Sequence, residues 1–321
     1  MPKKNIVLFI GNDVVAHMFL NHFIPKMVAD GINPILVMVT GKKPKAYNHT
    51  ELNRYHFYEN QLLNDIIYPH INNGTSEIKL NSLTPSQLIT KYDLQTISTT
   101  NVNAPELREQ LETMDFMGAI SVRCFQIFKT NIIKSMQAKG FFCNSHPGIL
   151  PYHKGVFCML RGIVNDQKHL GWTLHEIDEG IDTGRIIKRL PIKNMNISNP
   201  IPLYEQSIES LSDAWNDYIL EHVSHGYVDS YKQNLTGKYY TYPTESEISQ
   251  WVANGKLDKI ETKKMVAFYY NMFIPRSAKF TAEAMNFKIL LINKISQFET
   301  LMEHGTNVVE FDADITKQIA A

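Results

Sequence analysis

Few folds accommodate the order of segments with which this chain begins. Residues Ile6–Ile10 form an unbroken apolar run that ends at Gly11, a pattern typical of a buried parallel strand that enters a loop. Apolar residues then recur at helical spacing until Gly31, and a second apolar run follows at Ile35–Val39. A strand, a helix and a second strand in this order predict an α/β fold with a doubly wound, mostly parallel sheet.

The central part of the chain places two polar residues at the end of a predicted strand. An apolar run at Gly140–Cys143 leads directly to Asn144 and His146. Pro147 and Gly148 then forbid regular structure, so we expect the two polar residues to lie where the strand gives way to a loop. In an open α/β sheet, ligands bind at the carboxyl ends of the strands. These two side chains are therefore candidates for catalysis.

A carboxylate follows on a second loop. Two apolar runs, Trp172–Ile177 and Ile186–Ile192, are separated by a turn at Asp178–Gly180. This turn brings Asp182 close to a strand end. Together with the amide and the imidazole of the preceding loop, the carboxylate offers polarisation of a carbonyl group, proton transfer and electrostatic control of the imidazole.

Composition excludes several functional classes. The chain has 321 residues, which suggests about two domains, and its 32 Lys and Arg balance its 32 Asp and Glu. This balance gives no general attraction to nucleic acid or to an anionic membrane. No apolar run approaches the length that spans a membrane, and the N-terminal run is too short for a signal peptide.

Gly11 stands alone rather than in a GxGxxG pattern, so a dinucleotide-binding fingerprint is absent.

The cysteines indicate the compartment. Cys124, Cys143 and Cys158 lie in apolar contexts without metal-ligand spacing. An odd number without a paired pattern predicts reduced thiols and a cytoplasmic location, and it predicts no metal site.

A change in composition suggests the domain boundary. It follows a long helical pattern, and we therefore expect a catalytic domain at residues 1–224 and a smaller C-terminal α+β region at residues 225–321. In the second region, Thr244 and Glu247 predict a capping box at the start of a helix. Phe287–Ile295 is predicted to be a strand.

The two loops resemble the sequence motifs of the folate-dependent formyltransferases. This family includes glycinamide ribonucleotide transformylase, methionyl-tRNA formyltransferase and the sugar N-formyltransferases. Their motif resembles Asn-x-His-Pro-x-Leu-Leu-Pro followed by an Asp-x-Gly turn, and here Asn144 and His146 are followed by Asp182 and Gly184. An Ile-Leu pair replaces Leu-Leu. The resemblance covers residues 1 to about 200.

The resemblance implies transfer of a formyl group from N10-formyltetrahydrofolate to an amine, with Asn144, His146 and Asp182 as the catalytic residues. It also implies a pocket for the pterin ring. The residues expected to contact the folate are Phe125, Ile127, Phe128, Leu150, Pro151, His175, Asp178, Glu179, Gly180 and Ile181. For the three residues of the segment 125–128, a place in the core explains the sequence equally well.

The acceptor is expected to be a small-molecule amine, such as an amino sugar on a nucleotide carrier or a modified amino acid. From Tyr227 onward the charge is roughly balanced, whereas recognition of tRNA needs clustered Lys and Arg. His153 and Lys154 stand where the acceptor is expected to arrive. The helical pattern at Glu51–Ile71 has a surplus of Tyr and His, which either line an acceptor pocket or make aromatic contacts in the core.

Two other acceptors stay open at this point. A methionyl-tRNA formyltransferase-like enzyme uses the same chemistry on a larger substrate, and a formyltetrahydrofolate hydrolase uses water. We expect neither a nucleic-acid nor a membrane partner. The sequence leaves a homodimer open, and it does not assign a role to residues 225–321.

Overall fold

The chain forms two compact units. The computed structural model describes residues 4–40, 49–74, 79–165, 167–193, 199–234, 237–257 and 260–303. The first unit comprises Met1–Lys42 and Leu88–Leu257, and the second comprises Lys43–Gln87 and Asp258–Ala321. This division differs from the boundary after residue 224 that composition suggests, because an early segment of the chain packs with the C-terminal helices in the second unit.

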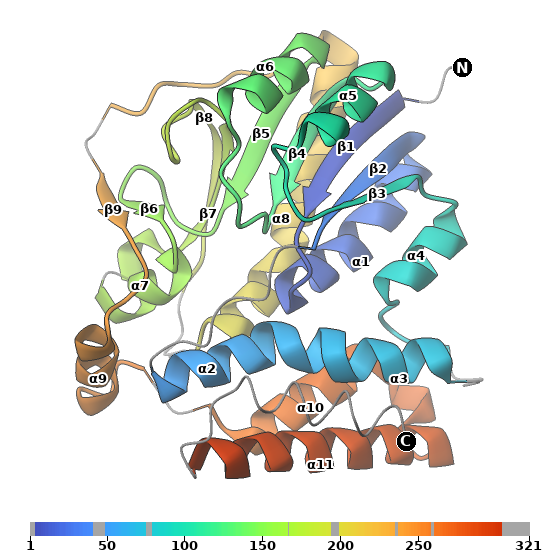
Figure 1. Ribbon diagram of the computed structural model, residues 1–321, viewed down its shortest axis with the longest axis vertical. Coiled ribbons are helices and arrows are strands. Elements are labelled where there is room, and N and C mark those ends of the chain that lie inside the picture. Colours follow the sequence, from blue (N-terminus) through green and yellow to red (C-terminus); the bar gives the residue numbers. More distant parts are fainter. Residues whose placement is uncertain are drawn as a thin grey trace. The chain divides into compact units, whose positions relative to one another are not determined.

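A seven-stranded sheet forms the centre of the first unit, with the order β3-β2-β1-β4-β5-β7-β8 (Figure 1). The strands β1 to β5 run parallel to one another, whereas β7 runs antiparallel to both of its neighbours, β5 and β8. The predicted doubly wound, mostly parallel α/β fold is therefore confirmed. The strands are β1 (Lys4–Ile10), β2 (Ile32–Val39), β3 (Thr96–Thr99), β4 (Gly118–Val122), β5 (Phe141–His146), β7 (Gly171–Glu176) and β8 (Ile186–Pro191).

Helices cover both faces of this sheet. On one face, Val7 and Phe9 belong to a buried cluster with apolar residues of α5 and α6, while α1 and α8 pack together on the other face (Figure 1). Asp13 caps α1, because its Oδ1 accepts a hydrogen bond from the backbone N–H of Ala16 at 2.8 Å. The helices are α1 (Val14–Ala29), α4 (Pro85–Tyr92), α5 (Pro105–Thr113), α6 (Thr130–Lys139), α7 (Cys158–Asn165) and α8 (Pro200–His225), with a 3₁₀ turn η2 at Gln167–His169.

A second, two-stranded sheet lies beside the main one. Strand β6 (His153–Gly155) pairs in parallel with β9 (Lys238–Tyr240), which joins segments far apart in the sequence. The helix α9 (Glu245–Ala253) follows β9. Its first turn carries the predicted capping box, with Thr244 Oγ1 accepting from the backbone N–H of Glu247 at 3.2 Å.

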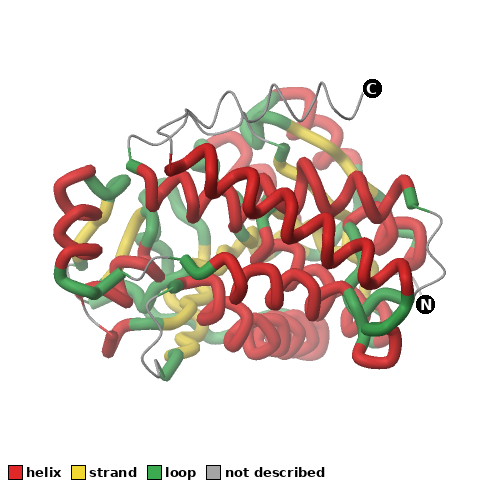
Figure 2. Tube along the Cα trace, turned by 90° about the horizontal axis from the view of Figure 1, so that it is seen from below, coloured by secondary structure: helices red, strands yellow, loops and turns green. Residues whose placement is uncertain are grey.

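The second unit contains only helices and loops in its described residues (Figure 2). Phe57 stacks on Phe298 with ring centroids 3.7 Å apart, and the hydroxyl of Tyr58 donates to Glu299 at 2.8 Å. These contacts favour the alternative in which the aromatic residues of the segment 51–71 pack in a core. The elements are α2 (Thr50–His56), a π-helix η1 (Phe57–Ile67), α3 (Tyr68–Asn73), α10 (Thr262–Phe273), a 3₁₀ turn η3 (Arg276–Ala278) and α11 (Ala282–Glu303).

The strand predicted at Phe287–Ile295 is wrong, because this segment belongs to the helix α11. Phe287, Leu291 and Ile295 are all buried and lie four residues apart. Such spacing places them on one face of a helix. A short apolar run fits either a helix or a strand, and the spacing of four residues between its buried members is the signal that distinguishes the two.

None of the helices in the described residues is long and apolar enough to cross a lipid bilayer. The three cysteines are free thiols. Burial raises the pKa of Cys143 to about 12, although its contact with Tyr218 acts in the opposite direction. This thiol is therefore protonated at neutral pH and behaves as a core residue.

Candidate active site

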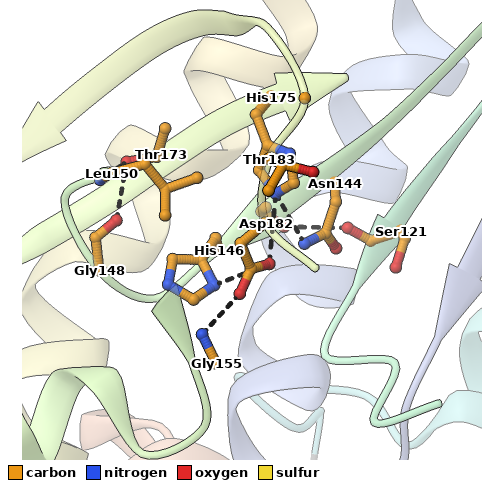
Figure 3. A network of polar contacts seen from close by, with 12 residues as sticks. Ser121, Asn144, His146, Gly148, Leu150, Gly155, Thr173, His175, Asp182 and Thr183 are labelled. Carbon is orange, nitrogen blue, oxygen red and sulfur yellow. Dashed lines mark hydrogen bonds and ion pairs between the residues drawn. The ribbon is translucent and has the colours of Figure 1, made fainter. Parts of the chain in front are cut away.

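The two central candidate residues extend from the carboxyl end of β5 (Figure 3). Asn144 and His146 are two residues apart in a strand, so their side chains lie on the same face of the sheet. The strand continues through His146 rather than ending at Asn144, because its last four residues also pair with β7. Both side chains are therefore held by a strand rather than by a free loop. At Asn144 this strand pairs with β4 on one side and with β7 on the other.

The loop after β5 is anchored to the sheet by Thr173. Its Oγ1 donates to the carbonyl of Gly148 at 2.7 Å and accepts from the backbone N–H of Leu150 at 3.0 Å. Leu150 is fully buried, and its carbonyl accepts from Nε of Arg189 at 2.8 Å. These contacts fix the Pro-Gly segment that follows His146.

The turn that carries Asp182 has an unusual backbone. Asp182 adopts a φ of 55°, in the left-handed region that few residues other than glycine occupy. Gly184 approaches the chain so closely that a Cβ there would lie 1.8 Å from the carbonyl of Glu176. The side-chain amide of Gln233 donates to the carbonyls of Asp182 and Gly184 at 3.0 and 2.8 Å. Backbone strain maintained by such contacts is often found at functional sites.

His146 and Asp182 form a buried ion pair. Nδ1 of His146 lies 3.4 Å from Oδ1 of Asp182, and Nε2 donates to the carbonyl of His153 at 2.7 Å. Burial opposes charging of the imidazole, but Asp182 and, to a smaller degree, the side chain of Cys158 raise the pKa of His146 well above its ordinary value. Burial likewise opposes ionisation of Asp182, yet the imidazolium lowers the pKa of the carboxyl group below its ordinary value. Both groups are therefore charged at neutral pH.

The amide of Asn144 is oriented by His175. Nδ1 of His175 lies 2.8 Å from the carbonyl of Glu176, and a carbonyl only accepts, so Nδ1 carries the proton. Burial lowers the pKa of His175 despite the nearby carboxylate of Asp182, so this imidazole is neutral. Its Nε2 then accepts from the Nδ2 of Asn144 at 3.2 Å. One hydrogen of the amide nitrogen is used in this bond, and the second is left for another acceptor.

The structure thus brings the amide, the imidazole and the carboxylate together. Oδ1 of Asp182 lies 3.7 Å from Nε2 of His175, which is the partner of Asn144. The arrangement offers a hydrogen-bond donor beside a fixed positive charge. Such a pair stabilises an oxygen that gains negative charge.

The residues expected to contact a folate fall into four groups. Phe125 and Ile127 are 65% and 63% exposed on the loop after β4. Phe128 instead packs edge-on against Phe9 and Phe142, with ring centroids 5.1 and 4.9 Å away. The turn residues Asp178, Glu179, Gly180 and Ile181 are exposed, whereas Leu150, Pro151 and His175 are buried.

The sequence does not predict several of the contacts that shape the site. The side chain of His153 is buried rather than open to an acceptor, and its carbonyl holds His146. The backbone N–H of Gly155 donates to Oδ2 of Asp182 at 2.7 Å. Backbone groups leave no side-chain signal, and Gln233 lies far along the chain from the turn it holds.

Comparison with known proteins finds a match over the segment that contains Asn144, His146 and Asp182. Residues 70–201 match the protein-family model described as formyl transferase. A dTDP-4-amino-4,6-dideoxyglucose formyltransferase of Mycobacterium bovis is 31% identical over 121 residues, 37% of this chain and 46% of the relative. A methionyl-tRNA formyltransferase of Halothermothrix orenii is 24% identical over 173 residues, 54% of each chain. The chain thus spans about half the length of these curated relatives.

Solved structures share the fold. A sugar 3N-formyl transferase crystallised in the presence of dTDP and 5-N-formyl-THF has a TM-score of 0.50 and 17% identity, over 75% of this chain and 71% of that one. Glycinamide ribonucleotide transformylase 1 from Symbiobacterium toebii has a TM-score of 0.50 and 10% identity, over 73% and 96%. These structures show the fold, and the matches to the family model and to the curated relatives confirm the resemblance indicated by the two loop motifs.

Proposed function

We propose that this chain, which is similar to the formyl transferases over residues 70–201, transfers a formyl group from N10-formyltetrahydrofolate to the amine of a small molecule. The observation that carries the proposal is the arrangement of Asn144, His146 and Asp182 at one strand end within the matched segment. The arrangement supplies the charge and the hydrogen-bond donor that acyl transfer needs.

When bound, the donor supplies a formyl carbon whose oxygen gains negative charge as the amine attacks. Asn144 offers its second amide hydrogen to that oxygen, since the first is donated to His175. Asp182 raises the pKa of His146 and so keeps the imidazole positively charged, and this charge stabilises the same oxygen. Both act before any proton moves, and a preorganised charge is worth more in a buried site than in water.

Proton transfer completes the reaction. The attacking amine loses a proton, and the departing nitrogen gains one as its bond to the formyl carbon breaks. Both ring nitrogens of His146 are engaged, with His153 and with Asp182. To carry a proton, the imidazole therefore has to release one of these partners, and the contact with Asp182, at 3.4 Å, is the longer of the two.

The residues around the site suit a reduced folate. The exposed side chains of Phe125 and Ile127 offer apolar surface for a ring. The exposed turn Asp178–Ile181 offers backbone donors and acceptors for the polar edge of a pterin. Asp178 stiffens this turn by accepting from Gly180 N–H at 3.2 Å and from the hydroxyl of Thr183 at 2.7 Å.

An amino sugar on a nucleotide carrier is the acceptor that we propose. The 31% identical relative is named for a dTDP-amino sugar, and the sequence from Tyr227 onward lacks the clustered Lys and Arg that recognition of tRNA needs. The second candidate is methionyl-tRNA, which is favoured by the longer match to the Halothermothrix orenii enzyme. We adopt the small-molecule acceptor, because it agrees with the balanced charge of the sequence from Tyr227 onward.

The test is a screen of acceptors with formyltetrahydrofolate. Purified chain is incubated with dTDP-amino sugars, amino acid amines, charged methionyl-tRNA or buffer alone, and tetrahydrofolate release and product mass are measured. We expect a product heavier by one formyl group only with an amino sugar nucleotide. Release that needs only water would identify a hydrolase, and a product only on methionyl-tRNA would replace the proposed acceptor.

Binding of the donor is testable without turnover. We expect reduced folates to stabilise the chain against unfolding, by about 2.7 kcal/mol at a free concentration of 100 times Kd, because they bind only the native state. NAD is the matched control and should not do so, since the GxGxxG pattern is absent. Thermal unfolding followed by calorimetry measures both. An unchanged unfolding temperature with saturating formyltetrahydrofolate would contradict the folate assignment.

A further inference from the structure

The strand β6 holds both members of the ion pair through its backbone. The carbonyl of His153 accepts from Nε2 of His146 at 2.7 Å. The N–H of Gly155 donates to Oδ2 of Asp182 at 2.7 Å. The distance between imidazole and carboxylate therefore depends on where this three-residue strand lies (Figure 3).

The position of β6 depends in turn on β9. The two strands form a sheet of only two short strands, which is marginal by itself. Gly155 has a φ of 92°, and a Cβ there would lie 2.1 Å from the carbonyl of Tyr240. The same carbonyl accepts from the N–H of Val156 at 3.0 Å. The two backbones are thus in direct contact at the residue that binds Asp182.

Arg161 of α7 anchors β9 and the helix that follows it. Its guanidinium binds the carboxylate of Glu247 with both terminal nitrogens, at 2.5 and 3.3 Å, and donates to the carbonyl of Thr241 at 3.3 Å. It also lies over the rings of Tyr240 and Trp251, 4.9 and 5.1 Å from their centroids. Arg161 is only 4% exposed. A buried cation with a bidentate partner and two aromatic faces is a strong point of attachment.

We propose that Arg161 is a positioning residue for formyl transfer: by holding β9 and α9 it fixes β6, whose backbone sets the distance between His146 and Asp182. The inference rests on the proposed function for its consequence in catalysis, but its structural part stands on the contacts alone. Within the described part of the chain, the polar partners of Arg161 are Glu247 and Thr241 rather than the imidazole or the carboxylate, so it acts through the two strands.

The first test is Arg161→Met, which keeps an unbranched apolar stem and removes the charged guanidinium group. We expect kcat to fall about tenfold to a hundredfold, because small displacements of reacting groups have effects of that size. The Kd for formyltetrahydrofolate should stay unchanged. The pKa of His146, followed by NMR of its ring Cε1–H, should fall by about one unit or more as Asp182 moves away.

His146 has other titratable neighbours that the comparison has to hold constant. Asp182 faces it from the loop after β7, Cys158 from α7 and His175 from β7. His153 contributes its carbonyl from β6. None of these residues is altered in the variants, so a change in the His146 titration reports their position.

Glu247→Gln is the second variant, and Arg54→Met is the matched control. Glu247 is 39% exposed, so its neutral form is tolerated even if Arg161→Met does not fold, and it should reproduce the effect more weakly. Arg54 is also a buried arginine with a carboxylate partner, Glu299 at 2.7 Å, but it belongs to the second unit. Its replacement should lower the unfolding temperature and leave kcat and the His146 titration unchanged.

The outcomes are separable. Folded Arg161→Met and Glu247→Gln proteins with wild-type kcat and a wild-type His146 titration would overturn the inference. An equal loss of kcat in Arg54→Met would also overturn it, because general destabilisation would then explain the effect. If the wild-type chain formylates no acceptor, the proposed function fails, and the His146 titration alone decides the role of Arg161.

Discussion

Replacing His146 by alanine lowers kcat by at least about 10²–10³-fold, the loss typical of a single oxyanion-stabilising group. The imidazolium supplies the positive charge beside the amide of Asn144, and Asp182 keeps it charged. Asn144→Ala is expected to fall within the same range, because it removes the amide hydrogen that is offered to the oxygen. Initial rates of tetrahydrofolate release at saturating substrates measure both variants.

The matched control for this variant is His222→Ala. His222 is another histidine of the same unit, half-buried on α8, and its ring packs on Phe141, with 4.8 Å between centroids. We expect its removal to affect stability more than kcat. A His146→Ala protein that is folded, binds folate and still formylates its amine at the wild-type rate would place the chemistry elsewhere in the chain.

The fold was largely accessible from the sequence because its central strands are buried on both faces. Such strands appear as unbroken apolar runs, as at Ile6–Ile10 and Ile35–Val39, and both became strands of the parallel sheet. Local signals at helix starts were equally informative, as the capping box of Thr244 and Glu247 shows. The strand predicted at Phe287–Ile295 is wrong, because the four-residue spacing of its buried residues is that of one helix face.

The division of the chain into two units could not be predicted from local sequence patterns. Arg54 binds Glu299, and the backbone of Tyr58 accepts a hydrogen bond from the hydroxyl of Tyr269. These partners are more than two hundred residues apart, and no local pattern announces such a contact. Composition changes gradually along a chain, whereas compact units are defined by which distant segments pack together.

The candidate site shows the same contrast. Asn144, His146 and Asp182 could be identified as candidates because each follows an apolar run, in an order that a known family shares. The groups that hold them are backbone atoms of β6 and side chains from far along the chain, such as Gln233. One signal was present: a buried arginine inside the apolar helix at Cys158–Asn165 requires a counter-charge, and Glu247 supplies it.

The buried ion pair makes Asp182→Asn the variant with the strongest dependence on pH. Its effect on stability follows from the shifts of both partners. The pKa of His146 is raised, so its contribution is complete below the ordinary value of about 6.5 and disappears as pH rises through the raised value. The pKa of Asp182 is lowered, so its contribution is present above the ordinary value of about 3.9 and disappears as pH falls through the lowered value.

The pair therefore stabilises the native state most between about pH 4 and pH 6.5. In that window, Asp182→Asn leaves a buried imidazole without its counter-charge, and we expect the free energy of unfolding to fall by about 3 kcal/mol. Above the raised pKa of His146 the difference between variant and wild type should shrink, because the imidazole is then neutral in both. Urea unfolding of both proteins across this pH range measures the difference.

Catalysis should change in parallel with the charge of His146. Without the carboxylate, burial lowers the pKa of His146, so at neutral pH the imidazole is neutral and no longer stabilises the oxyanion. We expect kcat to fall by about 10²–10⁴-fold, the range of acid–base groups, and the high-pH limb of the kcat profile to move to lower pH. Adding His146→Ala to Asp182→Asn should cost little more, because the two residues act as one unit. Additive losses in the double variant, or an unmoved pH profile in Asp182→Asn, would show that the carboxylate acts on the substrate directly and not through the imidazole.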